Sequence, residues 1–547
     1  MMRRLLWCAA AVVAQQRPRY TFWSSDFHIS PIHDLKAVLG GLGQDVVDKS
    51  LSGHCHLTKT CAKGLKVITK QNGINLGKCP NRLRREFYDA YKDDPEMATV
   101  DAFVCQHAAG LCEVFMAFGR PLVVVASTRY EIGRHDPKRW KAWSANLRRI
   151  AADPRNIVAA NNLYDARYIE YFTGLRVPVY ENWCGYAAAS AAKRPNLPVL
   201  VGPGGRDPPA PLVQKLKRLV PGAVKTIKEA YPGRFEYAQL ARHPALVLIP
   251  YQVSVMSLFE YYRMCLPLFV PTKELLWSWH RRFALLKERT WFGVHGKPRR
   301  ASPLPKHGNA TLDLFDHDPN DDLGDAAALA WHKNPAYDSR GTDTYATARL
   351  ELSDFYAWPH ITTFESIDAL PRVFKAADLA AIGRGMAAHN AEVKARVAGQ
   401  WEAALDAMFR GRPPRRDAPR APAPAFDDAM RRAYGVTATA STLGEPARGG
   451  GARRGPGAAG GARRGPGAAA GQSAAGRARA AAPPPANATS GKRVASYGLY
   501  GKNKKYTNGA IRNAEMVGDV FPGWVARFYC DATVPAAVRD RLARAGR

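Results

Sequence analysis

The 547-residue sequence lacks any run of about 18 consecutive apolar residues, so we expect no membrane-spanning helix. Its nine cysteines include no Cys-x-x-Cys pair, which argues against a zinc-binding module of the usual spacing. The aspartate-rich run at residues 313–322 has neither the glycine nor the final glutamate of an EF-hand, so we interpret it as a solvated acidic loop. We therefore predict no metal ion and no bound cofactor.

Acidic residues are scarce, since 79 Lys and Arg face 47 Asp and Glu and leave a net charge of +32. Such an excess is typical of nucleic-acid binders, but its location matters. Residues 412–479 carry 13 Arg against four acids, and residues 491–547 carry 11 Lys and Arg against four acids. About half of the excess therefore lies outside the main body. A basic body can also steer anionic nucleotide-sugars or acidic glycans, so we expect no nucleic-acid partner.

The amino terminus has the pattern of a secretory signal peptide. Arg3 and Arg4 precede the apolar run Leu5–Ala14, so we assign residues 1–14 to the signal. A misassigned start or a buried first strand is the alternative. Export to the Golgi or endoplasmic reticulum lumen, or to the cell exterior, would make Asn309 and Asn487 acceptors for N-glycosylation.

The cysteine-rich segment allows two interpretations. Cys55, Cys61 and Cys79 lie close together in the sequence and could form a disulfide in an oxidising lumen. His54 and His56 flank Cys55, so a metal site is the alternative.

Strand and helix patterns alternate along residues 20–410, which predicts an α/β fold with parallel sheets. We expect two Rossmann-like lobes, over residues 20–195 and 196–410. The second lobe would carry an insertion over 291–345. A long Ala-rich helix over Phe374–Phe409 would close the body by packing across both lobes.

The pattern changes after residue 410. Residues 451–459 and 461–469 repeat one nonapeptide, so we interpret 411–490 as a disordered Ala/Gly/Arg/Pro linker that cannot bury enough apolar surface to fold. Alternating strand and helix patterns return over 491–547, as in the opening part of a further α/β unit.

The segment His243–Pro271 is the most informative for function. A buried strand leads to Pro250, a polar turn follows, and a helix carries a glutamate before the next buried strand. This arrangement resembles the donor lobe of GT-B glycosyltransferases. The resemblance implies that Ser254 and Ser257 face a diphosphate, where a helix amino terminus favours anions, and that Glu260 binds a ribose. The chain departs from the family because its turn is not Gly-rich. A plain strand–helix–strand unit with a solvent-facing Glu260 is the alternative.

Further candidates follow other predicted strands, where parallel sheets bind ligands. Gly204, Gly205 and Arg206 follow the first strand of the second lobe and could approach an anion. Arg129 follows a buried strand and could bind a phosphate or an acidic sugar, although an Arg–Glu pair explains it equally well.

One further cluster follows the first strand of the first lobe. It contains Asp26, His28 and His33, any of which could be the base that removes a proton from an acceptor hydroxyl. A helix-capping loop is the alternative.

The end of the chain, from Val494 to Asp531, resembles the first βαβ unit of GT-A-like nucleotide-sugar transferases. The metal-binding Asp-x-Asp motif of such domains is absent, so we expect a truncated and inactive unit. The blocks SSDFHISP and IPYQVSVMSLFEYYR also resemble those of uncharacterised secreted eukaryotic proteins.

The sequence thus predicts a secretory glycosyltransferase that transfers a sugar from a nucleotide-sugar to a glycan or glycoprotein acceptor. The alternative is a non-catalytic glycan-binding or scaffold protein with the same two lobes.

Overall fold

The structure, a computed structural model, describes residues 17–57, 61, 64–69, 80–126, 130, 137–189, 193–204, 207–283, 285–286, 304–308, 347–418, 422–434, 493–499, 501–520 and 524–545. The predicted signal peptide, Asn309, Asn487 and most of the predicted insertion lie outside these residues. The chain divides into two units, residues 1–450 and 451–547.

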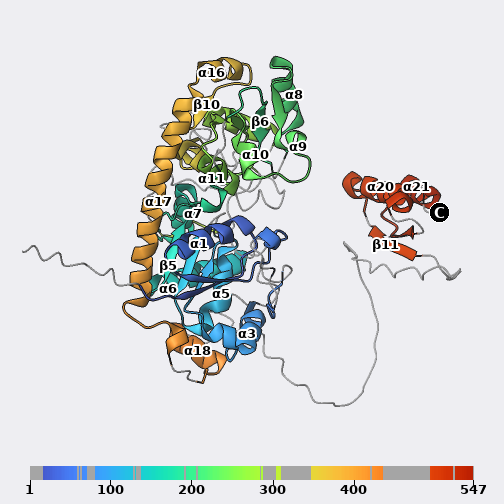
Figure 1. Cartoon of the computed structure of the whole chain (residues 1–547). Helices are drawn as coiled ribbons and strands as arrows, with labels where there is room; N and C mark the ends of the chain where they lie inside the picture. The colour runs from blue at the N-terminus through green and yellow to red at the C-terminus, as the bar shows by residue number, and fades with distance from the viewer. Residues whose placement is uncertain are drawn as a thin grey trace, which may run out of the picture. The chain divides into compact units, whose positions relative to one another are not determined.

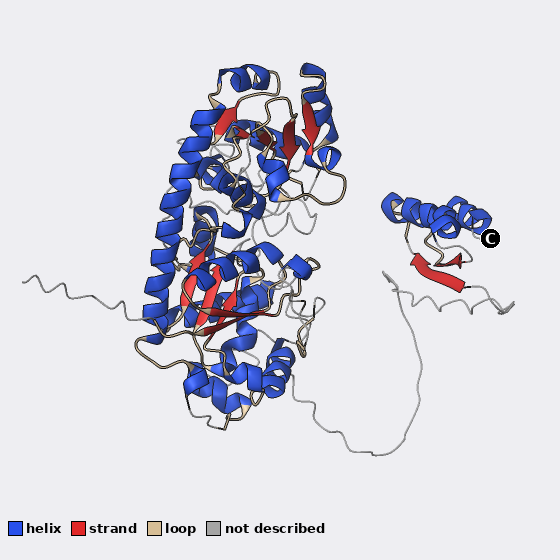
Figure 2. Ribbon diagram, viewed as in Figure 1, coloured by secondary structure: helices blue, strands red, loops and turns tan. Residues whose placement is uncertain are grey.

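The first lobe is built on a five-stranded parallel sheet in the order β2-β1-β3-β4-β5 (Figures 1 and 2). Its strands are β1 (Thr21–Ser24), β2 (Asp45–Asp48), β3 (Ala102–Cys105), β4 (Leu122–Ala126) and β5 (Ile157–Ala160). Every residue of β1, β3 and β4 is buried, as expected for strands with helices on both faces.

The second lobe repeats this design with a parallel sheet in the order β10-β9-β8-β6-β7. Its strands are β6 (Val199–Gly202), β7 (Val224–Thr226), β8 (Leu246–Leu248), β9 (Leu268–Pro271) and β10 (Thr362–Phe364). The predicted α/β class with two Rossmann-like lobes is therefore confirmed.

The helices of this unit connect the strands and cover the sheets. They are α1 (Ile29–Gly41), α3 (Pro80–Tyr91), α4 (Pro95–Ala98), α5 (Cys112–Phe115), α6 (Pro137–Ala152), α7 (Leu163–Thr173), α8 (Ala210–Leu219), α9 (Ile227–Ala230), α10 (Tyr237–Ala241), α11 (Met256–Arg263), α12 (Lys273–Phe283), α15 (Asp354–Ala357), α16 (Leu370–Ala376), α17 (Leu379–Phe409) and α18 (Phe426–Tyr434), with short 3-10 turns η1 (Cys55–Leu57), η2 (Ala109–Leu111), η3 (Met116–Phe118), η4 (Gly185–Ala187) and η7 (Arg415–Asp417). In the described part of the chain, no helix combines the length and apolar character needed to cross a bilayer.

Three strands escaped the sequence-based prediction, and all three lie at sheet edges. They are β2, β7 and β10, which are only partly buried. Edge strands do not need the continuous apolar run that marks the central strands, so their sequences give a weak signal. Residues 109–118, after β3, form no single helix and are divided among η2, α5 and η3.

Helix α17 contacts both lobes along its 31 residues (Figure 1). In the second lobe, Asn390 Nδ2 donates to the Tyr262 carbonyl at 3.1 Å. Nearer its end, the Trp401 ring lies 5.7 Å from the ring of Tyr180, and Phe409 stacks on Tyr20 of the first lobe. The buried side chains of α17 belong to the same apolar cluster as residues of both sheets. The helix therefore fastens the lobes together.

The folded part of the first unit extends beyond residue 410, where we expected the linker to begin. Phe426 of α18 is buried, and its ring lies 5.8 Å from Tyr88 of α3. Arg85 of α3 pairs with Asp427 at 3.0 Å. Apolar residues of α18 thus find a partner face on the first lobe, which the Arg- and Pro-rich composition around them obscured.

The second unit contains β11 (Arg493–Leu499), α20 (Lys504–Val520), β12 (Trp524–Cys530) and α21 (Ala536–Ala545). The two strands pair in parallel, and a small apolar cluster that includes Ile511 and Leu542 lies between strands and helices. This agrees with the alternation of strand and helix patterns read from the sequence over 491–547. Its resemblance to GT-A domains stays a prediction.

Truncation of Trp401 tests the fastening role of α17. Trp401 is 5% exposed, so Trp401→Ala should lower the free energy of unfolding by roughly 3–5 kcal/mol, the usual cost of emptying a large aromatic site. Urea unfolding followed by circular dichroism measures the change. Lys394→Ala, at an exposed position of the same helix, should change it by about 0.5 kcal/mol at most. Equal losses in the two variants would contradict the assignment.

Candidate functional site

The carboxyl ends of the two sheets meet at the junction between the lobes. Asn161 directly follows β5, and its Nδ2 atom donates to Ser254 Oγ at 3.5 Å. Ser254 lies in the loop that follows β8 of the second lobe. Parallel sheets present their ligand-binding loops at this edge, so a ligand at the junction would contact loops from both lobes.

Glu260 of α11 reaches across this junction to the first turn of α1. Its Oε1 atom accepts a hydrogen bond from Ser30 Oγ at 3.2 Å and one from Tyr186 OH at 2.7 Å. Tyr237 also hydrogen-bonds to this carboxylate. Burial raises the pKa of Glu260, whereas these hydroxyl donors lower it. Glu260 as a residue is half-buried, and its carboxylate is hydrogen-bonded inside the junction. The alternative of a solvent-facing Glu260 therefore does not describe this side chain.

Two of the predicted catalytic residues lie near the start of α1, His28 at its N-cap and His33 inside the helix. His33 of α1 is half-buried, and its ring lies 4.8 Å from the ring of Tyr186. His28 is exposed and caps α1, because its Nδ1 atom accepts a hydrogen bond from the Ser30 amide at 3.4 Å. The structure thus brings His33 into the group around Glu260, through their shared contact with Tyr186.

Asp26 has a different environment from the one expected of a base. One oxygen accepts from the His28 amide at 3.0 Å, and the other accepts from the amides of Gln106 and His107 at 2.9 and 2.7 Å. Burial raises the pKa of Asp26 to about 6, and these amide donors act in the opposite direction. Asp26 therefore ties together the loops that follow β1 and β3 and positions His28.

Ser254 also differs from its expected role at a diphosphate. It is buried, and its Oγ atom donates to Asp354 at 3.0 Å. Burial raises the pKa of Asp354 well above its ordinary value, and the bond from Ser254 opposes this rise. The polar turn after β8 is thus directed partly into the protein, because it supplies partners to buried groups of both lobes. Ser257 is half-buried and hydrogen-bonds to Tyr261.

Gly204 lies at the same edge of the second sheet. Its amide donates to Tyr261 OH at 3.4 Å, and a Cβ atom there would lie 3.2 Å from Ile227 Cγ2. Close packing against Ile227 therefore favours glycine at this position. The other predicted members of this loop, Gly205 and Arg206, lie outside the described residues, as does Arg129.

The sequence-based prediction missed the residues that hold the connection between the lobes. The carboxylate of Asp34 accepts from the amides of Trp183 and Cys184 at 2.8 and 2.5 Å. From the other side, Arg263 Nε donates to the Trp183 carbonyl at 2.7 Å. An aspartate one turn inside a helix and a Trp-Cys pair in a loop give no local signal, since their contacts span 149 and 80 residues.

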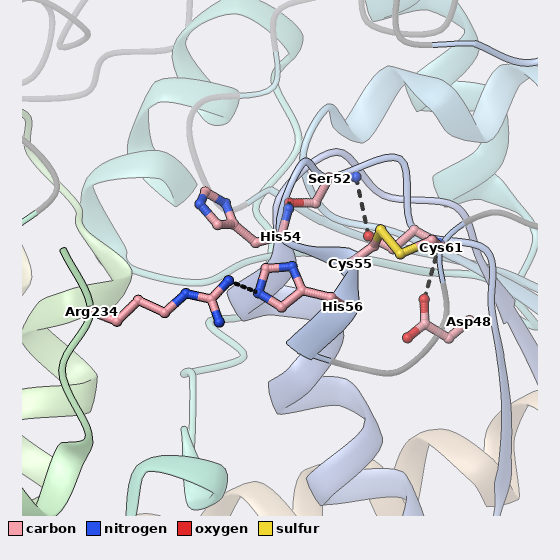
Figure 3. Close-up of a disulfide and its surroundings, with 8 residues drawn as sticks. Asp48, Ser52, His54, Cys55, His56, Cys61 and Arg234 are labelled. Atoms are coloured by element: carbon pink, nitrogen blue, oxygen red, sulfur yellow. Dashed lines mark hydrogen bonds between the residues drawn. A yellow bond between two sulfur atoms is a disulfide. The ribbon is translucent and has the colours of Figure 1, made fainter. Parts of the chain in front are cut away.

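Cys55 forms a disulfide with Cys61, which decides between the two interpretations of this segment (Figure 3). The thiolate needed for a metal site is therefore not available at Cys55. Among the described residues, no group of three or more His, Cys, Asp and Glu side chains is arranged to hold a metal ion.

The titration of Asp34 generates a testable dependence on pH. Burial raises its pKa to about 7, so the folded protein holds this proton more tightly than the unfolded chain does. The free energy of unfolding should therefore fall as pH rises between about 4 and 7, and Asp34→Asn should make this fall shallower. Urea unfolding of both proteins at several pH values in this window measures the slope. An unchanged slope in the variant would contradict the assignment.

No protein-family model matches the sequence, and no curated protein does. Among solved structures, two matches are the spinosyn rhamnosyltransferase SpnG and the same protein complexed with thymidine diphosphate. They have 12% and 13% sequence identity and TM-scores of 0.26 and 0.27, and each match covers 65% of this chain and 100% of the other. A similarity at this level carries no functional argument. The argument for function rests instead on the residues at the lobe junction.

Proposed function

We propose that the two-lobed body transfers a sugar from a nucleotide-sugar donor to a glycan or glycoprotein acceptor. One observation carries the proposal. Glu260, at the carboxyl edge of the second sheet, accepts hydrogen bonds from Ser30 and Tyr186, and the His33 ring lies beside the same Tyr186. Such a transfer requires a group that binds the donor and a base for the acceptor hydroxyl. A carboxylate that accepts hydroxyl hydrogen bonds suits the first role, and an imidazole suits the second.

Glu260 provides the donor side of the proposed reaction. In the structure its carboxylate accepts hydrogen bonds from three hydroxyl groups, those of Ser30, Tyr186 and Tyr237. A ribose offers the same kind of donor, so it can replace Ser30 without leaving the carboxylate unsatisfied. Ser257 and the Gly204 amide lie along the same edge and would approach the diphosphate. The nucleotide-sugar is a co-substrate, and no resident cofactor is invoked.

His33 provides the acceptor side. His28 uses the lone pair of Nδ1 to cap α1, so its neutral form carries the proton on Nε2 and is poorly placed to accept another. His33 lies one turn further along α1, beside Tyr186. As the acceptor hydroxyl attacks the anomeric carbon, His33 would take its proton while the nucleoside diphosphate leaves.

The proposed location is the secretory pathway. The Cys55–Cys61 disulfide supports it, because such bonds persist in oxidising compartments and are rare in the cytosol.

A non-catalytic glycan-binding protein is the second candidate. It is favoured by the enclosure of Asp26, whose described hydrogen bonds are all to backbone amides. With the Asp26 carboxylate held by amides, such a protein would bind a glycan without turnover.

Nucleotide binding tests the proposal. We expect UDP-, GDP-, dTDP- or CMP-sugars to raise the unfolding temperature of the protein, and Glu260→Gln to weaken the binding about tenfold, the usual effect of losing a hydrogen bond to a charged group. Ser30→Ala should leave binding intact or strengthen it, because it removes the hydroxyl that competes with the ribose. Differential scanning fluorimetry measures both effects.

Glu392→Gln, at an exposed position of α17, serves as the control and should bind as the wild type does. A folded wild-type protein that no nucleotide stabilises would falsify the proposed donor site. Nucleotide binding that persists in Glu260→Gln would remove Glu260 from it. Binding without transfer in the wild type, or full transfer in His33→Gln, would remove His33 from its proposed role as base.

A further inference from the structure

A second polar cluster joins the lobes at some distance in sequence from Glu260 (Figure 3). Arg234, in the loop before α10, directs its guanidinium group at His56 of η1, with 3.1 Å between Arg234 NH2 and His56 Nε2. The His54 ring lies 6.2 Å from the ring of His56. All three side chains are exposed. Because a guanidinium group only donates, His56 must accept through Nε2.

The charge of the cluster is not neutralised by a described carboxylate. Within the described ranges, no carboxylate pairs with His54, His56 or Arg234. Neighbouring cations of the same lobe do have carboxylate partners, since Lys49 pairs with Glu96 at 2.7 Å and Lys66 with Asp94 at 2.9 Å. Arg234 is therefore poised to exchange a neutral imidazole for an anion.

The backbone that carries the two imidazoles is also constrained. Cys55 lies between them and is cross-linked to Cys61 (Figure 3). The amide of His54 donates to Ser52 Oγ at 3.1 Å, and the Cys55 amide donates to the Ser52 carbonyl at 3.2 Å. A constrained loop loses less conformational entropy when a ligand binds, so this short segment is suited to recognition.

We propose that His54, His56 and Arg234 bind a sulfate or carboxylate group of an anionic glycan, which is the acceptor of the proposed transfer. The guanidinium group offers two parallel N–H donors to such an anion, and each imidazole adds one further donor. This inference rests on the proposed function only where it identifies the bound glycan as the acceptor of the transfer. The binding site itself can be tested without the donor.

Binding of three polysaccharides to the full chain at a fixed salt concentration tests the inference. Chondroitin sulfate carries sulfate and carboxylate groups, hyaluronan carries carboxylate groups alone, and dextran is neutral. The wild type should bind the anionic chains and not dextran. Arg234→Gln should weaken this binding about tenfold, and His54→Gln with His56→Gln should weaken it further. Arg218→Gln removes the same charge from an exposed position of α8 and should change the affinity less than twofold.

Binding of chondroitin sulfate alone identifies sulfate as the recognised group, and binding of both anionic chains identifies the carboxylate. Equal losses in Arg234→Gln and Arg218→Gln mean that net charge alone attracts the glycan, and overturn the inference. So does equal binding to dextran.

The thermal shift caused by the nucleotide, measured on the same proteins, separates the two proposals. If Arg234→Gln loses the nucleotide shift and keeps glycan binding, the cluster holds the diphosphate, and the inference fails. If the wild type shows no nucleotide shift, the proposed donor site fails, whereas the polysaccharide result still decides the cluster.

Discussion

Carboxylates at the lobe junction take their hydrogen-bond donors from segments far away along the chain, and the arrangement of the first unit depends on this constraint. Glu260 belongs to the second lobe, yet it accepts hydrogen bonds from Ser30 of the first lobe and from Tyr186 of the connection. Asp34 belongs to the first lobe and accepts from the amides of Trp183 and Cys184 in the same connection. An unpaired carboxylate away from water is costly, so the lobes cannot separate or rotate freely without exposing these groups or supplying other donors.

The apolar packing of α17 also restricts how the two lobes can move relative to each other. The helix contacts Tyr262 of the second lobe and Tyr20 of the first, so it limits the relative positions that the lobes can adopt. Arg263 adds a second link, because it contacts both the Trp183 carbonyl and the Asn390 carbonyl of α17. A ligand that replaces Ser30 at Glu260 would therefore remove one hydrogen bond between the lobes, while α17 still holds the two lobes together.

The same geometry divides the proposed chemistry between the lobes. The second lobe supplies the carboxylate and hydroxyl groups suited to a nucleotide, whereas α1 of the first lobe supplies His33 beside Tyr186. Asp26 keeps the loop before α1 in place through backbone amides and need not react itself. The cluster at Arg234 and His56 is a separate link between the lobes, with an opposite electrostatic character.

The sequence by itself determined the fold class, the central strands and the position of Glu260 on a helix after a buried strand. These features are local, because a buried parallel strand is a short apolar run and its helix follows directly. The sequence did not reveal the edge strands β2, β7 and β10, whose partial burial leaves no such run. Nor did it reveal which partners the polar residues have. Only the tertiary structure decided that Ser254 is directed to Asp354, that Asp26 binds amides 80 residues away, and that Glu260 meets Ser30 across 230 residues, because hydrogen bonds at such separations leave no periodicity in the chain.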